Sequence, residues 1–107
     1  MHPELDPNDE NTRKIIQETA PIPWQELQRF FAAGQAIEVS KDIDLIYVAK
    51  QFSDDNAVAI KTWMDNGEVK LVSDESAARW FEVNTSVWAT VVLPWVLVQE
   101  KSTSNTK

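Results

Sequence analysis

The chain has 107 residues, of which 25% are charged and 43% hydrophobic, and these proportions are typical of one folded domain. It contains no cysteine, which excludes disulfide scaffolds, thiolate metal sites and cysteine nucleophiles. The net charge of -7 argues against a protein that neutralises nucleic-acid phosphates through a basic face. Carboxylates are therefore the only abundant reactive groups.

We expect residues 1–8 to be a mobile lead-in, residues 9–100 to form a single domain, and residues 101–107 to be a disordered tail. The first residues lack the basic start and apolar run of a secretory signal, and with the absence of cysteine this favours the cytoplasm. Residues 83–99 carry no charge, but their apolar part is too short and too β-branched for a membrane span. We therefore expect no membrane partner.

Helical signals dominate the first third of the chain. Asn8 or Asp9 can cap a helix that runs to about residue 19 and is stopped by the prolines that follow. Apolar residues recur at helical spacing over 24–33, and Gly34 follows where a left-handed cap is expected. This pattern predicts a second amphipathic helix.

The middle of the chain is less clear. Residues 36–39 are a short strand candidate. Residues 43–52 match the helix and strand templates equally well, and we favour a helix because Asp42 can cap it.

The second half alternates between helices and strands. The run Ser-Asp-Asp-Asn at 53–56 starts a helix that extends to about residue 65. We expect that helix to bury four apolar residues, Ala57, Ile60, Trp63 and Met64. A short strand at 69–72, a helix at 74–82 capped by Ser73, and a long last strand at 87–99 bent near Pro94 complete the chain. The fold predicted is α+β, with about five short helices on a small sheet of about three strands.

Several catalytic chemistries lack their residues. The only histidine is His2, in the predicted lead-in, so histidine-based catalysis and histidine metal clusters are excluded. The two glycines are far apart in sequence, so no phosphate-binding glycine loop is present. We assign no catalytic residue, cofactor or metal ligand, and the sequence favours a non-enzymatic protein over an enzyme.

Two pairs of aspartates could form a polar cluster: Asp42 with Asp44, and Asp54 with Asp55. Oxygen ligands of this kind suit calcium or magnesium. An EF-hand loop fails, because its sixth and twelfth positions fall on a tyrosine and a serine instead of a glycine and a glutamate. Helix capping explains both pairs more simply. A cation site remains the alternative, favoured if all four carboxylates converge on one pocket.

The five tryptophans are the unusual feature of the sequence. Trp24, Trp63 and Trp80 lie on the apolar sides of predicted helices, and we expect them in the core. Trp88 and Trp95 lie on the last strand, where alternation puts bulky apolar groups on both faces. The sequence leaves core and interface equally open for these two.

A strand that is apolar on both faces needs cover on both sides, and a short chain supplies two covers with difficulty. Pro94 cannot donate to a sheet ladder, so it belongs at an edge or a bulge. We therefore expect a homodimer or a protein partner bound along this strand. The predicted interface residues are Trp88, Pro94, Trp95 and Leu97.

Motifs spread over residues 12–100 resemble a known family. They are residues 23–27 (PWQEL), residues 42–45 (DIDL), Trp63 with Gly67, Trp80, and residues 94–100 (PWVLVQE). Together they resemble the small bacterial proteins grouped as domain of unknown function 2288. The resemblance implies a bacterial, intracellular protein of about this length. It implies no activity, and it carries over no site residue.

Three functional hypotheses follow. The first is an acidic, cytoplasmic, non-enzymatic module for protein interaction or self-association, supported by the apolar last strand. The second is a small carboxylate-based ligand binder, divalent-cation binder or enzyme, whose small-molecule ligand the sequence does not identify. The third is an acidic mimic of nucleic acid, which rests only on the charge of -6 carried by residues 1–60. We rank them in this order and expect no nucleic-acid partner.

Overall fold

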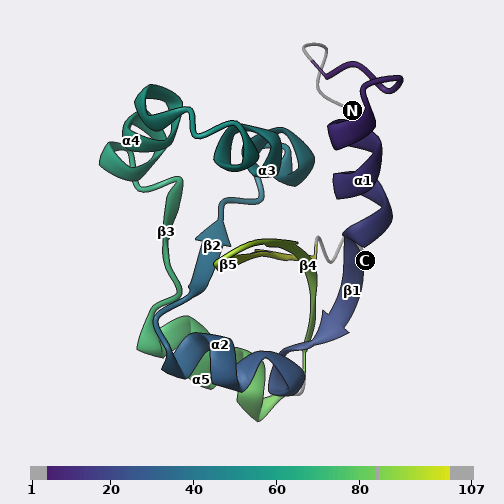
Figure 1. Ribbon diagram of the computed structural model, residues 1–107. Coiled ribbons are helices and arrows are strands. Elements are labelled where there is room, and N and C mark those ends of the chain that lie inside the picture. Colours follow the sequence, from purple (N-terminus) through teal and green to yellow (C-terminus); the bar gives the residue numbers. More distant parts are fainter. Residues whose placement is uncertain (1–4, 84, 102–107) are drawn as a thin grey trace.

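The chain folds into a five-stranded sheet between two layers of helices, in a computed structural model that describes residues 5–83 and 85–101 (Figure 1). One layer contains α1 (Glu10–Glu18), α3 (Leu45–Ser53) and α4 (Ala57–Asp65). The other contains the 3-10 helix η1 (Trp24–Leu27), α2 (Gln28–Ala32) and α5 (Asp74–Glu82). The predicted α+β class with five helices is confirmed. The predictions for residues 1–4, including His2, and for residues 102–107 lie outside the described residues.

The sheet has five strands where about three were predicted. They are β1 (Ala20–Pro23), β2 (Ala36–Val39), β3 (Val69–Leu71), β4 (Ser86–Val92) and β5 (Trp95–Glu100). Their order across the sheet is β1-β4-β5-β2-β3, with β2 and β5 parallel and the other pairs antiparallel. The central position therefore belongs to β5, the last strand of the chain.

The first strand missed by the sequence prediction is β1, which contains two prolines. Pro21 and Pro23 were assigned to the end of the first predicted helix, and Pro23 also to the first turn of the next, so no strand was predicted between the two helices. In the structure β1 is an edge strand that pairs with β4 alone, with Pro21 opposite Trp88. An edge strand tolerates proline because one of its sides has no partner strand.

The second error concerns the predicted long strand at 87–99, which is two strands. β4 and β5 form an antiparallel hairpin joined at Leu93 and Pro94, and the peptide bond between these two residues is cis. The register runs from Val92 opposite Trp95 to Val87 opposite Glu100. The uncharged apolar sequence continues through the turn, so only Pro94 marked the position where the chain reverses.

Polar side chains start the helices at nearly the predicted places. The Asp9 carboxylate accepts a hydrogen bond from the Thr12 amide at 3.0 Å at the start of α1. This bond is the main reason that the pKa of Asp9 lies below its ordinary value. The helix at 43–52 is confirmed as α3, but its cap is Asp44 and not Asp42, because Asp44 accepts from the Ile46 amide at 2.8 Å.

The predicted helix at 24–33 is split into η1 and α2. Gly34 ends it with a φ of 72°, in the left-handed region that favours glycine, as predicted.

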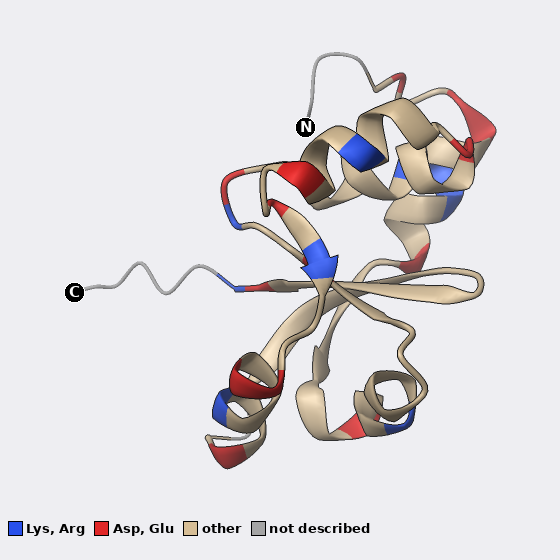
Figure 2. Ribbon diagram, turned by 90° about the vertical axis from the view of Figure 1, so that its left-hand side faces the viewer, with Lys and Arg blue, Asp and Glu red and all other residues tan. Residues whose placement is uncertain are grey.

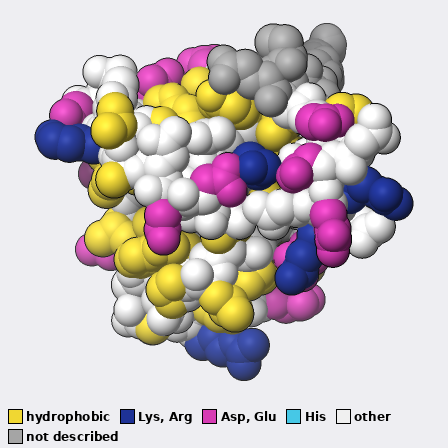
Figure 3. All heavy atoms as spheres, turned by 45° about the horizontal axis from the view of Figure 1, so that its top comes forward, with side chains coloured by type: hydrophobic (Ala, Val, Ile, Leu, Met, Phe, Trp, Pro, Cys, Tyr) yellow, Lys and Arg dark blue, Asp and Glu magenta, His cyan; other side chains and the backbone are white. Residues whose placement is uncertain are grey.

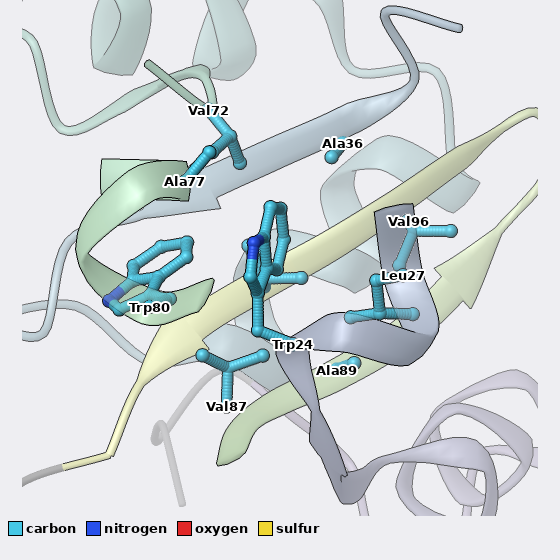
Figure 4. Packing of buried hydrophobic residues seen from close by; sticks show 10 residues of the cluster. Trp24, Leu27, Ala36, Val72, Ala77, Trp80, Val87, Ala89 and Val96 are labelled. Carbon is cyan, nitrogen blue, oxygen red and sulfur yellow. The ribbon is translucent and has the colours of Figure 1, made fainter. Parts of the chain in front are cut away.

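The first of two cores lies between the sheet and the layer of η1 and α5. Trp24 and Trp80 are 0% and 1% exposed, and their ring centroids lie 5.1 Å apart in an edge-to-face arrangement. Trp24 is surrounded by Leu27, Val87, Ala89 and Trp80 (Figure 4). The prediction that Trp24 and Trp80 belong to the core is confirmed.

The chain covers both faces of its central strand. Val96 and Val98 belong to the core beneath η1 and α5, whereas Leu97 belongs to a second core beneath α1 and α3. These three residues are at most 2% exposed. The expectation that so short a chain supplies two covers with difficulty does not hold for the middle of β5, because helices of the same chain lie on both faces of the sheet.

The end of β5 is tied to α5 by Glu100. Its Oε1 accepts hydrogen bonds from the Arg79 guanidinium at 3.0 Å and from the Trp80 indole at 3.2 Å. Burial opposes the ionisation of this carboxyl, but the two hydrogen bonds together with the positive charges of Arg79 and Lys41 outweigh burial and hold its pKa below the ordinary value. Among the described residues, no helix is long and apolar enough to cross a membrane.

Candidate interaction surface

The turn between β4 and β5 carries exposed apolar side chains. We call residues 91–95 the hairpin tip. Leu93 is 84% exposed and Val91 is 41% exposed. The end of the hairpin that carries the tip extends from the sheet as a band without charged residues, since residues 86–99 contain none (Figure 2). The predicted interface includes Pro94 and Trp95 of this segment but not Leu93, because no turn was predicted here that would expose Leu93 at its end.

The four predicted interface residues have different surroundings. Trp88 is 38% exposed, and the Lys101 ammonium lies 5.5 Å from its ring centroid. Pro94 is exposed in the turn, and Trp95 is half-buried. Leu97 is 0% exposed, so it belongs to the core and cannot contact a partner directly. The predicted interface is thereby reduced to three residues.

Trp95 forms part of an apolar hollow of about 690 Å³ between α4 and the sheet. Its apolar lining residues are Ile37, Phe52, Ala57, Ile60, Met64, Leu71 and Trp95. Three charged residues also line it: Asp55, Lys61 and Asp65. Lys61 and Asp65 form an ion pair at 3.0 Å, so the charges of two of the three compensate each other. The volume and lining of this apolar hollow are typical of binding sites.

The helix that forms one wall of the apolar hollow is poorly covered. None of the residues of α4 is fully buried, and Val58 and Met64 are 79% and 49% exposed. Burial was predicted for Ala57, Ile60, Trp63 and Met64. This prediction is wrong for Ala57 and Met64, which are exposed, whereas Ile60 is half-buried and the half-buried Trp63 packs against the second core. The reason is that α4 contacts mainly α3 and the short edge strand β3, and these cover little of it.

The charges of this layer are distributed unevenly. Hydrophobic side chains gather on the α4 side, whereas charged side chains crowd the α1 side (Figure 3).

A second hollow of about 400 Å³ lies between α1 and the hairpin tip. It shares Phe52 and Asp55 with the apolar hollow, and its other wall includes Leu93. The hairpin tip therefore stands between two adjoining hollows.

The predicted polar cluster does not assemble. Asp42 and Asp44 lie before α3, whereas Asp54 and Asp55 follow its last residue. The rise of a helix separates residues 44 and 54 by about 15 Å. Among residues 5–83 and 85–101, no group of three or more Asp, Glu, His or Cys side chains could hold a metal ion.

The aspartates of the predicted cluster have local roles. Asp44 caps the start of α3, and Asp54, directly after its end, forms an ion pair with Lys50 of α3. Asp55 has a φ of 55°, and Asn56 rather than either aspartate caps α4. The capping interpretation is thus confirmed for Asp44 alone among the four.

Comparisons with known proteins identify relatives but no activity. The model of the family described as "Protein of unknown function (DUF2288)" matches residues 10–100. The NMR solution structure of PA1075 from Pseudomonas aeruginosa is similar to this chain, with a TM-score of 0.78 and 32% sequence identity. That similarity covers 100% of this chain and 98% of the other. No curated protein matches the chain.

Proposed function

Since this chain belongs to the DUF2288 family, whose description names no activity, we propose that it is a non-enzymatic self-association module. In this proposal the hairpin tip of one copy enters the apolar hollow of a second copy. The observation that carries it is Leu93, a large apolar side chain that is 84% exposed and lines the second hollow, which adjoins the apolar hollow at Phe52 and Asp55.

Burial of Leu93 in the contact would make the free energy of association more favourable. Full burial of a leucine side chain contributes about 1.5–3 kcal/mol relative to its exposed state. Residues 83–99 carry no charge, so the insertion of the tip desolvates no ionised group of its own. A two-fold axis would bury Leu93 twice, once in each copy. In such an isologous contact the same surface of each copy must carry both the inserted segment and the hollow that receives it. The hairpin tip and the apolar hollow lie on one surface of this chain.

Charge favours this surface as the contact between two copies. Each chain has a net charge of -7, so two copies repel each other over most of their surfaces. The tip is uncharged, and the charges of Lys61 and Asp65 in the apolar hollow compensate each other. Of the charged residues in the apolar hollow, only Asp55 is left without a compensating neighbour in the lining, so the insertion of an uncharged tip brings few like charges together.

Sedimentation equilibrium over a wide concentration range tests the proposal. We expect a monomer–dimer equilibrium that Leu93→Ser and Met64→Ser each weaken by at least about tenfold, because both remove an apolar contact from the interface. Val58→Ser is the matched control for Met64→Ser, because Val58 is exposed on the same helix and does not line the apolar hollow. Its dimerisation constant should equal that of the original chain.

A monomer at every concentration would refute the proposal. So would a dimer that survives both Leu93→Ser and Met64→Ser, because its contact would lie elsewhere. Trp95→Ala provides a further test, since Trp95 belongs to the hairpin tip and also lines the apolar hollow. It should weaken the dimer as well.

A bacterial origin and a cytoplasmic location belong to the same proposal. The solved relative comes from Pseudomonas aeruginosa, and the chain has no cysteine, as suits a reducing compartment. Fractionation of cells that express the native protein, followed by detection with an antibody, tests the location.

A further inference from the structure

A groove of about 720 Å³ runs between the two helical segments on the other face of the sheet. One wall consists of Gln25, Gln28 and Phe31, from η1 and α2. The other wall belongs to α5. We call this hollow the helix groove. It does not include the hairpin tip or any residue of the apolar hollow.

The middle of the helix groove is lined by apolar residues, two of which are small alanines. On α5 it is lined by Ala77 and Ala78, whose small side chains let another backbone approach closely, and by Phe81, which is 51% exposed. Phe31 faces them from α2 and packs edge-to-face on Trp24 with ring centroids 5.8 Å apart. The Gln25 amide donates to the Phe81 carbonyl at 3.4 Å and links the two walls.

Both ends of the α5 wall are acidic. Asp74 and Glu82 line the groove at the first and last residues of α5, about 12 Å apart by the helical rise. No Lys or Arg lines the groove among the described residues. The nearby Arg29 lies over the Phe30 ring, and Arg79 pairs with Glu100. The carboxylates at the groove therefore have no neutralising cation in it.

Glu82 makes this arrangement unfavourable for the isolated chain. A carboxylate in the last turn of a helix meets the negative end of the helix dipole and the unpaired carbonyl groups. Glu82 forms no ion pair among the described residues. A cation bound at this end of α5 would compensate both the side chain and the helix end.

We propose that the helix groove binds an amphipathic basic helix of a partner protein. Its apolar side chains would lie over Ala77, Ala78 and Phe81, and two of its Lys or Arg residues would reach Asp74 and Glu82. Two turns of a helix rise about 10.5 Å, so cations seven positions apart match the spacing of the two carboxylates. The proposal is independent of self-association.

The probe is a synthetic alanine-based helical peptide with two lysines seven positions apart and leucines three and four positions after the first lysine. Fluorescence anisotropy of the labelled peptide measures its binding to the full chain. We expect saturable binding that Asp74→Asn with Glu82→Gln weakens by about tenfold or more. Phe81→Ser should weaken it as well. Added salt should lower the affinity.

Glu75→Gln is the matched control, because Glu75 also lies in the first turn of α5 but does not line the groove. Its affinity for the probe should be unchanged. Glu82→Gln alone keeps the test valid if the double variant folds poorly, because removal of this charge favours the end of α5. Leu93→Ser should bind the probe normally, which separates this proposal from self-association.

Three results would overturn the proposal. The first is no saturable binding of the lysine peptide. The second is equal binding of a peptide with glutamates in place of both lysines. The third is an equal loss of affinity in Glu75→Gln and in the double variant, since the probe would then respond only to the overall charge of the chain.

Discussion

Two helices of this protein, α4 and α5, are each nine residues long and begin with a side-chain cap, yet only α5 is buried. Asn56 caps α4 and Ser73 caps α5, each by accepting a hydrogen bond from a backbone amide three residues later. α5 buries Ser76, Ala77 and Trp80, whereas α4 fully buries no residue. Local sequence therefore forms both helices equally well, and packing distinguishes them.

The two tryptophans of these helices show where the difference arises. Trp80 lies over the middle of the sheet, packs on Trp24, and donates to Glu100 on the central strand. Trp63 is half-buried, and its ring lies edge-on to Tyr47 of α3 with centroids 5.9 Å apart. α4 thus lies at the edge of its layer. Its apolar side chains remain accessible to a partner.

The largest expected effect in this comparison comes from Trp80→Ala. Truncation of a fully buried tryptophan costs about 3–5 kcal/mol, because it loses the transfer free energy and leaves a cavity. Trp63→Ala should cost about half as much or less, because the half-buried ring loses less contact. Urea unfolding followed by circular dichroism measures both. Equal losses would show that α4 is as firmly packed as α5.

The next effect is that of the caps, which should not distinguish the helices. Ser73→Ala and Asn56→Ala should each lower the free energy of unfolding by about 1 kcal/mol, because each leaves one backbone amide without its acceptor. The same unfolding experiment measures both variants. A loss at Ser73 several times that at Asn56 would contradict the view that only packing separates α4 from α5.

Those local features were the ones the sequence predicted well. The boundaries of α5, the cap at Ser73 and the core positions of Trp24 and Trp80 follow from spacing and side-chain chemistry. The orientation of α4 did not follow. Periodicity shows which side of a helix is apolar, but not whether a second layer reaches that side.

The candidate interaction surface was predicted only in part, because it too depends on how distant parts of the chain pack. The apolar composition indicated the segment around Pro94 and Trp95, but the sequence pattern predicted one continuous strand there instead of a hairpin. The hairpin buries Leu97 at the centre of the sheet and exposes Leu93 at the turn. Both outcomes depend on the neighbours of β5, which are strands distant in sequence or reached by a reversal of the chain.

A smaller effect concerns the contact between α5 and β5, and it depends on pH. The lowered pKa of Glu100 means that its ionised form stabilises the fold at pH values above its ordinary value of 4.5. This contribution is lost as the pH falls through the lowered value. Glu100→Gln should therefore destabilise the protein near neutral pH by about 1 kcal/mol or less, because the partly exposed carboxylate is screened by water.

Urea unfolding at several pH values measures this contribution as the difference between the original chain and Glu100→Gln. The difference should shrink as the pH is lowered below 4.5. Glu75→Gln is the control, since Glu75 is a carboxylate on α5, the helix that Glu100 contacts, and makes none of these hydrogen bonds. A constant difference at all pH values would mean that the hydrogen bonds of Glu100 do not depend on its charge.

The smallest expected effect is that of Val58→Ser on α4. Because Val58 is 79% exposed, it loses little buried area, and the free energy of unfolding should change by less than about 0.5 kcal/mol. Thermal and urea unfolding of the variant measure this at low protein concentration, where the proposed dimer is dissociated. A loss above about 1 kcal/mol would mean that Val58 is covered within one molecule. If both Val58→Ser and Met64→Ser leave the free energy of unfolding nearly unchanged, folding alone does not require apolar side chains on the outer side of α4.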